Sequence, residues 1–587
     1  MGTLVWCNRA AVRRLLTTFW TEPDSAFNLG LFRVLFFLGA TFLWLPTGPG
    51  LGEVKSLTSI PDSLVFEPQV LGSLLAAIPR SPGSVAAWHT LLLVSAVTAA
   101  VGLMPRLSAA VWTVAAFNYV GIPNLFGKVD HHQHLIWIGA VFALSPAGDV
   151  LSVQALIRSV RGYAGVPTET RARRYAIPLR CIWVFLGLVY LFPGLYKYAG
   201  DGLGWFNPSV QAGWIHAQMA NGRSPLIDVS EISPLLFMGA LFGLVFETTA
   251  ILLILHRITR AFVAGMILFF HSMTFVIMGI PFVSLQVCAP SLIDWASLSE
   301  WRFRRKGQLH FAADANCGIC EKTVEVLKSQ TLPGGIAFST AQAVHEGSGV
   351  RGLEQVTLDD LVTDIHLTDG EKVWVGYDAY RRAAWRLPAL WLFLPLLYLW
   401  PVRKAGMAIY GHVARNRTCG VRPPEPRVRS VASPFWPLVV AVPVVVTMLI
   451  CALPTQPGLR PAVAGWPVSV YPLFAGEPRQ QTVRVFARYM EPARGRSETD
   501  LHTKFPGLNG AQAQVFFERI IKENNPEQIN ALLTLASEGL PPGTDVSLIA
   551  VHKPVIGARS APDPNRLIAH RVVAEVSHAG DHALLHR

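Results

Sequence analysis

The feature that most constrains this chain is a series of apolar runs separated by short stretches rich in arginine. A spanning helix needs about 20 mostly apolar residues. Hydrophobic residues make up 51% of the 587 residues and charged residues only 15%, whereas soluble proteins carry roughly 25% charged residues. The sequence therefore predicts a multi-spanning membrane protein with about eight or nine transmembrane helices. We expect them at 28–47, 86–104, 108–125, 134–150, 176–196, 233–255, 261–280 and 434–453, with a weaker candidate at 281–298.

The arginine clusters orient these helices, because cytoplasmic loops of membrane proteins carry an excess of Lys and Arg. Clusters lie near the N-terminus, after the fourth and sixth runs and at 300–308, as alternate crossing requires. The run 261–280 leads outward, and the cluster at 300–308 must lie in the cytoplasm. The segment 281–298 is therefore expected to be a crossing or a re-entrant hairpin. Membrane topology thus accounts for the net charge of +12, and no nucleic-acid partner is expected.

This orientation divides the chain into five parts. The apolar segment 389–400 is too short to span a bilayer easily, so we expect it in a domain core or at the membrane interface. No secretory signal or internal repeat is apparent. The parts are a cytoplasmic N-terminus (1–27), a transmembrane domain (28–300), a cytoplasmic domain (301–430), a transmembrane helix (434–453) and an extracytoplasmic C-terminal region (454–587).

Cys317 and Cys320 form a Cys-x-x-Cys motif, and the scattered remaining cysteines exclude a disulfide-stapled fold. The segment "QLHFAADANCGICEKTVEVLKSQ" predicts a strand, a turn, the motif and an amphipathic helix. Further strands follow in "GIAFST" and in a hairpin around 369–370. In this thioredoxin-like context the helix N-terminus stabilises the first thiolate, and the second cysteine resolves a mixed disulfide. Half of a zinc site is the alternative, but no second CxxC or HxxxH is present.

The predicted fold class is therefore a membrane all-α domain with a cytoplasmic thioredoxin-like α/β domain. A small extracytoplasmic α+β region follows the last transmembrane helix.

Lys197 ends the fifth apolar run and is followed by the Gly-rich segment "YAGDGLGWFNPS". One interpretation is a snorkelling lysine, whose ammonium reaches the lipid headgroups. The other is a partly desolvated lysine in a pocket that the Gly-rich segment covers. Because desolvation disfavours the charged form, its neutral amine can then act as a base.

Other ionisable groups lie in or beside apolar runs. His271 and Glu247 are functional candidates because an ionisable side chain within a membrane is costly. The structural alternative for His271 is a neutral ring bonded to a neighbouring helix, and we expect Glu247 to pair with His271 or Lys197. The run 130–134 contains clustered histidines, but adjacent ones point in different directions on a helix and no ExxH spacing occurs. No metal site is expected.

Four stretches occur in the order found in the horizontally transferred transmembrane domain, the membrane fold of vitamin K-dependent gamma-carboxylase and its bacterial relatives. They are "FNLGLFRVLFFLGATFLW", "DHHQHLIWIGAVFALSPAGDVLSV", "YLFPGLYKYAGDGLGW" and "LFFHSMTFVIMGIPF", and the resemblance covers about residues 20 to 300. It implies that Lys197 is the catalytic base, which deprotonates a reduced quinone so that oxygen can attack.

The resemblance also matches His132 and His271 to the family's histidines, although His131 and His134 compete with His132 for the alignment. Pro193 replaces the usual alanine. The chain lacks the long luminal region of the animal enzyme, so the resemblance is weaker for peptide carboxylation than for quinol oxidation.

A second resemblance covers about residues 308 to 420. Asp314, three residues before Cys317, and the stretches "VWVGYDAYRRAAWRLP", "LWLFLPLLYLWP" and "IYGHVARNR" resemble the DCC family of thiol-disulfide oxidoreductases. Ala315 replaces the glycine that usually follows the aspartate. The family's chemistry implies a thiol or disulfide partner, either a protein or a small thiol. No tightly bound cofactor is evident in the sequence.

The two resemblances predict a multi-pass redox protein of the cell membrane, in which a quinol-oxidising, carboxylase-like module is fused to a thiol-disulfide oxidoreductase. A reduced quinone is the expected cosubstrate. The alternative is a non-catalytic membrane scaffold or sensor whose CxxC domain binds a partner.

Overall fold

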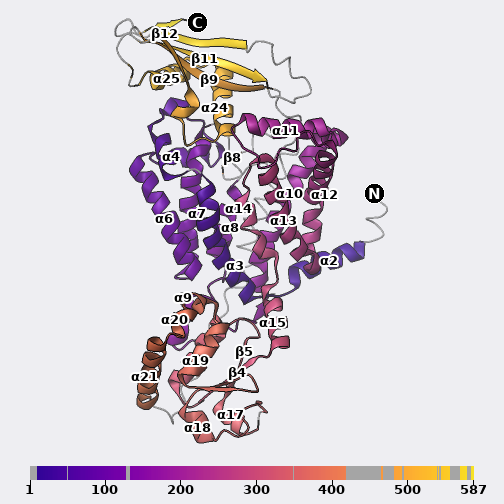
Figure 1. Ribbon diagram of the computed structural model, residues 1–587, viewed down its shortest axis with the longest axis vertical. Helices are drawn as coiled ribbons and strands as arrows, with labels where there is room; N and C mark the ends of the chain where they lie inside the picture. The colour runs from indigo at the N-terminus through magenta and orange to yellow at the C-terminus, as the bar shows by residue number, and fades with distance from the viewer. Residues whose placement is uncertain are drawn as a thin grey trace.

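The computed structural model describes residues 9–48, 50–126, 132–347, 349–417, 427, 465–466, 481–491, 495–538, 540, 544–554, 569–577 and 584–586. These residues form three parts along the long axis of the molecule (Figure 1). A helix bundle lies in the middle, an α/β domain at one end, and a second domain with a sheet at the other end. The predicted helix at 434–453 lies outside the described residues.

Apolar helices build the bundle. Within the described part of the chain, five helical stretches are long and apolar enough to cross a membrane. They are Ala26–Thr47, Pro82–Val101, Arg173–Ala199, Ser233–Leu255 and Arg257–Met278. The main helices are α3 (Ala26–Gly39), α6 (Pro82–Val101), α7 (Pro105–Gly121), α8 (Gln133–Leu144), α10 (Arg173–Asp201), α12 (Ser233–Leu255) and α13 (Arg257–Met278).

Shorter elements connect these helices at the two ends of the bundle. Towards the sheet-containing domain lie α4 (Leu51–Ser56), η6 (Gly202–Phe206) and α11 (Pro208–Ala220). Towards the α/β domain lie α9 (Val153–Val160) and α15 (Trp295–Lys306). The helices α7 and α8 correspond to the predicted runs 108–125 and 134–150 and are shorter than those runs.

The weak run 281–298 does not form one long helix. It contains α14 (Val283–Gln286) and η7 (Ala289–Leu292), joined by non-helical residues. At one end of the segment, Gly279 lies against Ser224, and at the other end Asp294 accepts a hydrogen bond of 2.9 Å from Asn28. Ser224 follows α11 and Asp294 precedes α15, and these two helices lie at opposite ends of the bundle (Figure 1), so the segment connects the two ends in an irregular conformation.

The α/β domain has the predicted strand, CxxC and helix order. Its sheet has the order β5-β4-β6-β7, in which β4 and β5 are parallel and the other pairs antiparallel. The helix α16 (Gly318–Gln330) connects β4 to β5, and the predicted hairpin around 369–370 joins β6 to β7. The strands are β4 (Leu309–Ala313), β5 (Ile336–Thr340), β6 (His366–Thr368) and β7 (Val373–Val375).

Helices complete the α/β domain. They are α17 (Ala341–His345), α18 (Leu358–Thr363), α19 (Tyr377–Ala383), η9 (Pro388–Phe393), α20 (Leu394–Leu397) and α21 (Trp400–Asn416).

The α/β domain is fastened to the bundle through the C-terminal end of α16. The backbone N–H of Leu151 donates to the carbonyl of Ser329 (2.9 Å), and that of Thr168 donates to the carbonyl of Lys328 (3.0 Å). The N–H of Gly165 donates to the Glu325 carboxylate at 2.6 Å. Terminal carbonyls of a helix lack partners within the helix, so the membrane domain supplies them here.

The domain at the other end has an antiparallel sheet of order β10-β9-β11-β12-β13. The helix α24 packs against the bundle, with the Phe516 ring 5.9 Å from Phe66 and 6.0 Å from Phe126. A Cβ on Gly510 would lie 2.1 Å from the carbonyl oxygen of Asn221, so the approach requires glycine. The elements are β9 (Gln481–Glu491), β10 (Gly495–Asp500), α24 (Gly510–Glu523), α25 (Pro526–Ser537), β11 (Asp545–Pro554), β12 (Ala569–Ser577) and β13 (Leu584–His586).

Candidate functional site

Lys197 forms a buried ion pair with Glu247. Its Nζ lies 2.5 Å from Oε1 and 2.6 Å from Oε2 of the carboxylate. The lysine is 3% exposed and the glutamate 4%. The snorkelling interpretation is therefore wrong for this structure, because the ammonium ends on a carboxylate inside the protein. Of the two partners predicted for Glu247, the structure selects Lys197.

Two glycines of α10 explain why the pair can form. A Cβ on Gly194 would lie 2.8 Å from Cγ2 of Thr248, and one on Gly187 would lie 2.8 Å from Cγ1 of Ile251. The two glycines are seven residues apart, so they lie on one face of the helix. Small residues on such a face let two membrane helices approach closely. The α10–α12 contact thus brings Lys197 and Glu247 within bonding distance.

A cavity of about 440 Å³ borders Lys197, and we call it the lysine cavity. The Trp205 ring from η6 lies 5.1 Å from Nζ, a cation–π distance, so the Gly-rich segment after Lys197 covers the site as expected. Met238 and Phe269 line the cavity and are about half exposed on the bundle surface, so it opens toward the lipid. Most of the remaining wall is apolar and comes from α11, α12, α13 and the loop between α11 and α12: Trp214, Ile215, Val229, Leu235, Leu236, Phe242, Phe270, Met273, Ile277 and Met278.

His271 lies behind the wall of the lysine cavity. It is buried, and its Nε2 is 2.8 Å from the hydroxyl oxygen of Tyr190. Tyr190 precedes Lys197 by two turns of α10, about 10 Å along the helix axis. The His271 ring contacts Phe270 at 5.1 Å, a residue of the cavity wall, and Phe282 at 5.0 Å on another side. The histidine is thus bonded to a neighbouring helix, as its structural alternative predicts.

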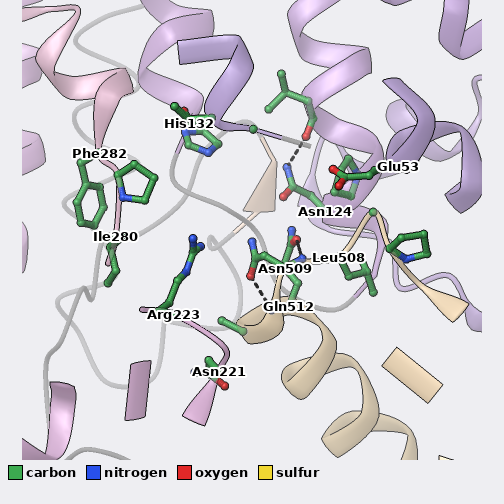
Figure 2. Close-up of a pocket in the computed structure, with 18 of the residues that line it drawn as sticks. Glu53, Asn124, His132, Asn221, Arg223, Ile280, Phe282, Leu508, Asn509 and Gln512 are labelled. Carbon is green, nitrogen blue, oxygen red and sulfur yellow. Dashed lines mark hydrogen bonds between the residues drawn. The ribbon is translucent and has the colours of Figure 1, made fainter. Parts of the chain in front are cut away.

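His132 belongs to a different cavity, of about 360 Å³, which we call the histidine cavity (Figure 2). It lies between the bundle and the C-terminal domain. Figure 2 shows His132, Arg223 and Phe282 on one side and Asn509 and Gln512 of α24 on another. The structure therefore does not bring His132 to Lys197, and neither His132 nor His271 lines the lysine cavity.

The other residues of the histidine run are placed as follows. His134 is buried within α8, and Asp130 and His131 lie outside the described residues. In the part of the chain that is described, no group of three or more His, Cys, Asp or Glu side chains could hold a metal ion.

In the α/β domain, Cys317 is the N-cap residue of α16, and Cys320 lies in its first turn. Both are thiols. Cys317 is 0% exposed and Cys320 2%, whereas Ile319 between them is about half exposed. The predicted helix-start position of Cys317 is confirmed, but both sulfur atoms are covered by protein.

Arg417 is a site residue that the sequence did not reveal. Its Nη1 donates to Sγ of Cys320 at 3.3 Å, and its Nη2 donates to the carbonyls of Val362, at 2.6 Å, and Thr363. A guanidinium at this distance favours the thiolate form of a cysteine. In the sequence Arg417 lies beside Arg415, Arg422 and Arg427, and no local motif distinguishes it from these arginines.

Tyr380 and Asp314 complete the surroundings of the motif. Burial raises the pKa of the Tyr380 hydroxyl to about 12 beside the two cysteines, so this group stays neutral near pH 7. Asp314 accepts hydrogen bonds from the backbone N–H of Asn316 (2.9 Å) and from the Gln342 side chain (2.8 Å). It therefore shapes the turn that precedes Cys317.

Comparison with protein families agrees with this division. Residues 21–294 match the HTTM domain, and residues 313–419 match the DCC1-like thiol-disulfide oxidoreductase family. The chain carries an HTTM domain followed by a DCC1-like domain. The HTTM match contains the Lys197–Glu247 pair, His132 and His271, and the DCC1-like match contains both cysteines and Arg417. No curated protein and no solved structure matches the chain.

Proposed function

We propose that the protein is a membrane redox enzyme in which the HTTM domain oxidises a quinol and the DCC1-like domain exchanges thiols and disulfides. The observation that carries the first half is the Lys197–Glu247 pair at the wall of an apolar cavity. Aromatic and aliphatic walls fit the ring and isoprenoid tail of a quinol, and the opening toward the lipid fits a substrate that dissolves in the bilayer.

In this proposal Lys197 acts as the general base. The pair is electrically neutral whether its shared proton lies on the amine or on Glu247. With the proton on Glu247, the neutral amine accepts the proton of a quinol hydroxyl: the O–H bond breaks, an N–H bond forms, and the negative charge stays on the quinol oxygen. The resemblance to carboxylases implies that dioxygen is the oxidant, which then takes electrons from the quinolate.

The thiol half uses Cys317 as the attacking thiolate at the N-terminus of α16. It attacks a partner's disulfide, whose S–S bond breaks, and a mixed disulfide forms while one partner thiolate leaves. Cys320 then attacks Cys317 in that mixed disulfide and releases the second partner thiolate. The partner gains the two electrons that the CxxC pair loses.

A purified full chain, assayed for quinol consumption with and without oxygen, tests the membrane half. We expect consumption that requires oxygen and Lys197. A purified, folded chain that consumes no quinol under either condition would contradict the proposal.

We further propose that the DCC1-like domain is cytoplasmic and the C-terminal domain extracytoplasmic. The arginine clusters support this orientation, as does the position of the two domains at opposite ends of the bundle (Figure 1). Reporter fusions after residue 425 and at Arg587 should respond oppositely. The same response from both would refute the orientation and the separation of Lys197 from the cysteines by the membrane.

One observation favours a second candidate, a non-catalytic scaffold or sensor. Both cysteines of the motif are almost fully buried, which limits access of a partner disulfide. In that case Cys317 of the folded chain should react slowly with a small disulfide at all pH values, whereas an oxidoreductase should exchange it rapidly.

A further inference from the structure

The DCC1-like domain contains an apolar segment that its own core does not cover. Residues 385–404, which we call the aromatic segment, include η9, α20 and the first turn of α21. Pro388–Leu397 and Trp400–Asn416 meet at an angle of 111°, so they do not form one straight spanning helix. The sequence left open whether this segment belongs to a core or to an interface.

The exposure of its side chains decides against the core. Leu387 and Leu394 point inward and are buried, which anchors the segment to the domain. Leu392 is 82% exposed and Trp400 70%. The other exposed large side chains of the segment are Trp385, Trp391, Phe393, Leu396, Tyr398, Leu399 and Val402. Soluble surfaces rarely present so many adjoining apolar groups without a partner.

Basic side chains outnumber acidic ones beside the aromatic segment, where Asp378 pairs with Arg381 at 3.0 Å and with Arg403 at 2.9 Å. Between Asp378 and Arg417 the sequence contains Arg and Lys but no carboxylate. Nζ of Lys404 lies 5.1 Å from the centre of the Trp400 ring, and the guanidinium of Arg381 lies 4.5 Å from the Tyr398 ring. Aromatic rings combined with basic side chains are typical of segments at a membrane surface, where the cations meet anionic headgroups.

The position of the aromatic segment in the molecule indicates that its partner is the membrane surface. Figure 1 shows α20 close to the level of α9, at the end of the bundle that faces the α/β domain. The short helix α9 itself exposes Leu156, Ile157 and Val160. Because the spanning helices of the bundle end at this level, the bilayer surface passes here, and the exposed apolar side chains of α9 and of the aromatic segment meet it.

We propose that the aromatic segment lies in the headgroup region of the leaflet next to the DCC1-like domain and binds anionic lipid there. It enters the leaflet without crossing, so the chain before and after it stays on one side of the membrane. The contact holds the CxxC domain against the membrane surface, together with the bonds from α16 to the bundle.

The experiment uses the full chain in lipid nanodiscs with benzoylphenylalanine in place of Leu392. Illumination should give phospholipid adducts, identified by mass spectrometry. The control carries the same photoreactive residue in place of Glu346, which is exposed at the end of α17, at the far end of the domain, and should give none. An adduct between two copies of the chain, or equal lipid adducts at both positions, would overturn the proposal.

Two further measurements separate the apolar and the charged contributions. With the photoreactive residue at Leu399, the double variant Trp391→Glu/Leu392→Glu should reduce the adduct yield several-fold. Discs of phosphatidylcholine alone should give a lower yield than discs that contain phosphatidylglycerol. An equal yield in the two lipids would overturn anionic-lipid binding by the segment, and an unchanged yield in the double variant would overturn its insertion.

Discussion

The membrane site and the CxxC site both bury a reactive group beside a charged side chain: Glu247 lies beside Lys197, and Arg417 lies beside Cys320. The two sites differ in how a substrate can reach the reactive group. Lys197 is held by Glu247 and also borders the lysine cavity, which is large enough for a flat organic ligand. Cys317 and Cys320 are covered, and Arg417, which follows α21, bonds both to Sγ of Cys320 and to the last two carbonyls of α18.

This difference indicates how each site meets its substrate. The lysine site is preformed, because its charge is compensated while the cavity remains open to an apolar molecule. The thiol site is closed, so a disulfide partner must displace part of the covering chain before it reaches sulfur. In the proposed function, the same chain therefore combines a preformed site for a small lipid-soluble ligand with one that has to open for its partner.

The largest expected effect comes from Lys197→Arg. Arginine keeps the positive charge but is always protonated, so it cannot accept a proton. Quinol consumption should fall by about 100-fold or more, the range of general-base contributions, and Lys197→Ala should be equally inactive. Lys504→Arg, at an exposed lysine of the C-terminal domain, is the control. An active Lys197→Arg variant would remove the base from the proposal.

Glu247→Gln tests the pair through stability. Removing one partner of a buried ion pair leaves an uncompensated charge and costs about 3–5 kcal/mol. The unfolding free energy in detergent should drop by that amount. The double variant Lys197→Met/Glu247→Gln should recover most of the loss, since neither charge remains. A double variant as unstable as Glu247→Gln would show that the charge is not the cause.

Gly194→Ala tests the close approach of the two helices. The added Cβ would meet Thr248 at 2.8 Å and Glu247 at 3.1 Å, and overpacking of this kind typically costs about 1–3 kcal/mol. Gly239→Ala is the matched control, because a Cβ there has no neighbour within 4 Å. Equal stability of the two variants, measured by unfolding in detergent, would contradict the close α10–α12 contact.

The smallest expected effect concerns Arg417→Gln. Loss of the guanidinium should move the pH at which Cys320 becomes reactive toward iodoacetamide upward by about one unit, measured site by site with mass spectrometry. Cys317 should change less, because its thiolate depends on the start of α16. Arg415→Gln, on the exposed side of α21, should leave both profiles unchanged. A similar shift in the Arg415 variant would mean a general effect of charge.

Much of the fold follows from local patterns in the sequence. Apolar length predicts the bundle helices, and the strand, CxxC and helix order predicts β4, α16 and β5 with nearly the observed bounds. Local patterns predict less at 281–298, where the segment connects the two ends of the bundle, as a crossing does, but forms two short helices instead of one spanning helix. Proline and serine interrupt that run, and buried contacts within the bundle hold its broken helices in place.

The candidate site is less predictable, because its parts come from distant segments. Hydropathy marks Lys197, Glu247 and His271 as unusual, but only the packing of α10 on α12 decides which of them pair. His132 lines the histidine cavity instead, and residues 506–512 of the C-terminal domain form part of the wall of that cavity. The sequence gives no sign that these two distant segments meet. The contact between Arg417 and Cys320 cannot be predicted from local sequence, because it depends on where α21 ends in the folded domain.

The distance along the chain between Lys197 and Glu247 has a consequence for biosynthesis. Glu247 follows Lys197 by 50 residues, so α10 reaches the membrane while α12 is still being made. During that interval Lys197 is an unpaired ammonium, which opposes stable placement of the end of α10 in the lipid. The later arrival of α12 neutralises it. We therefore expect the end of α10 to become stable in the bilayer only when α12 packs against it.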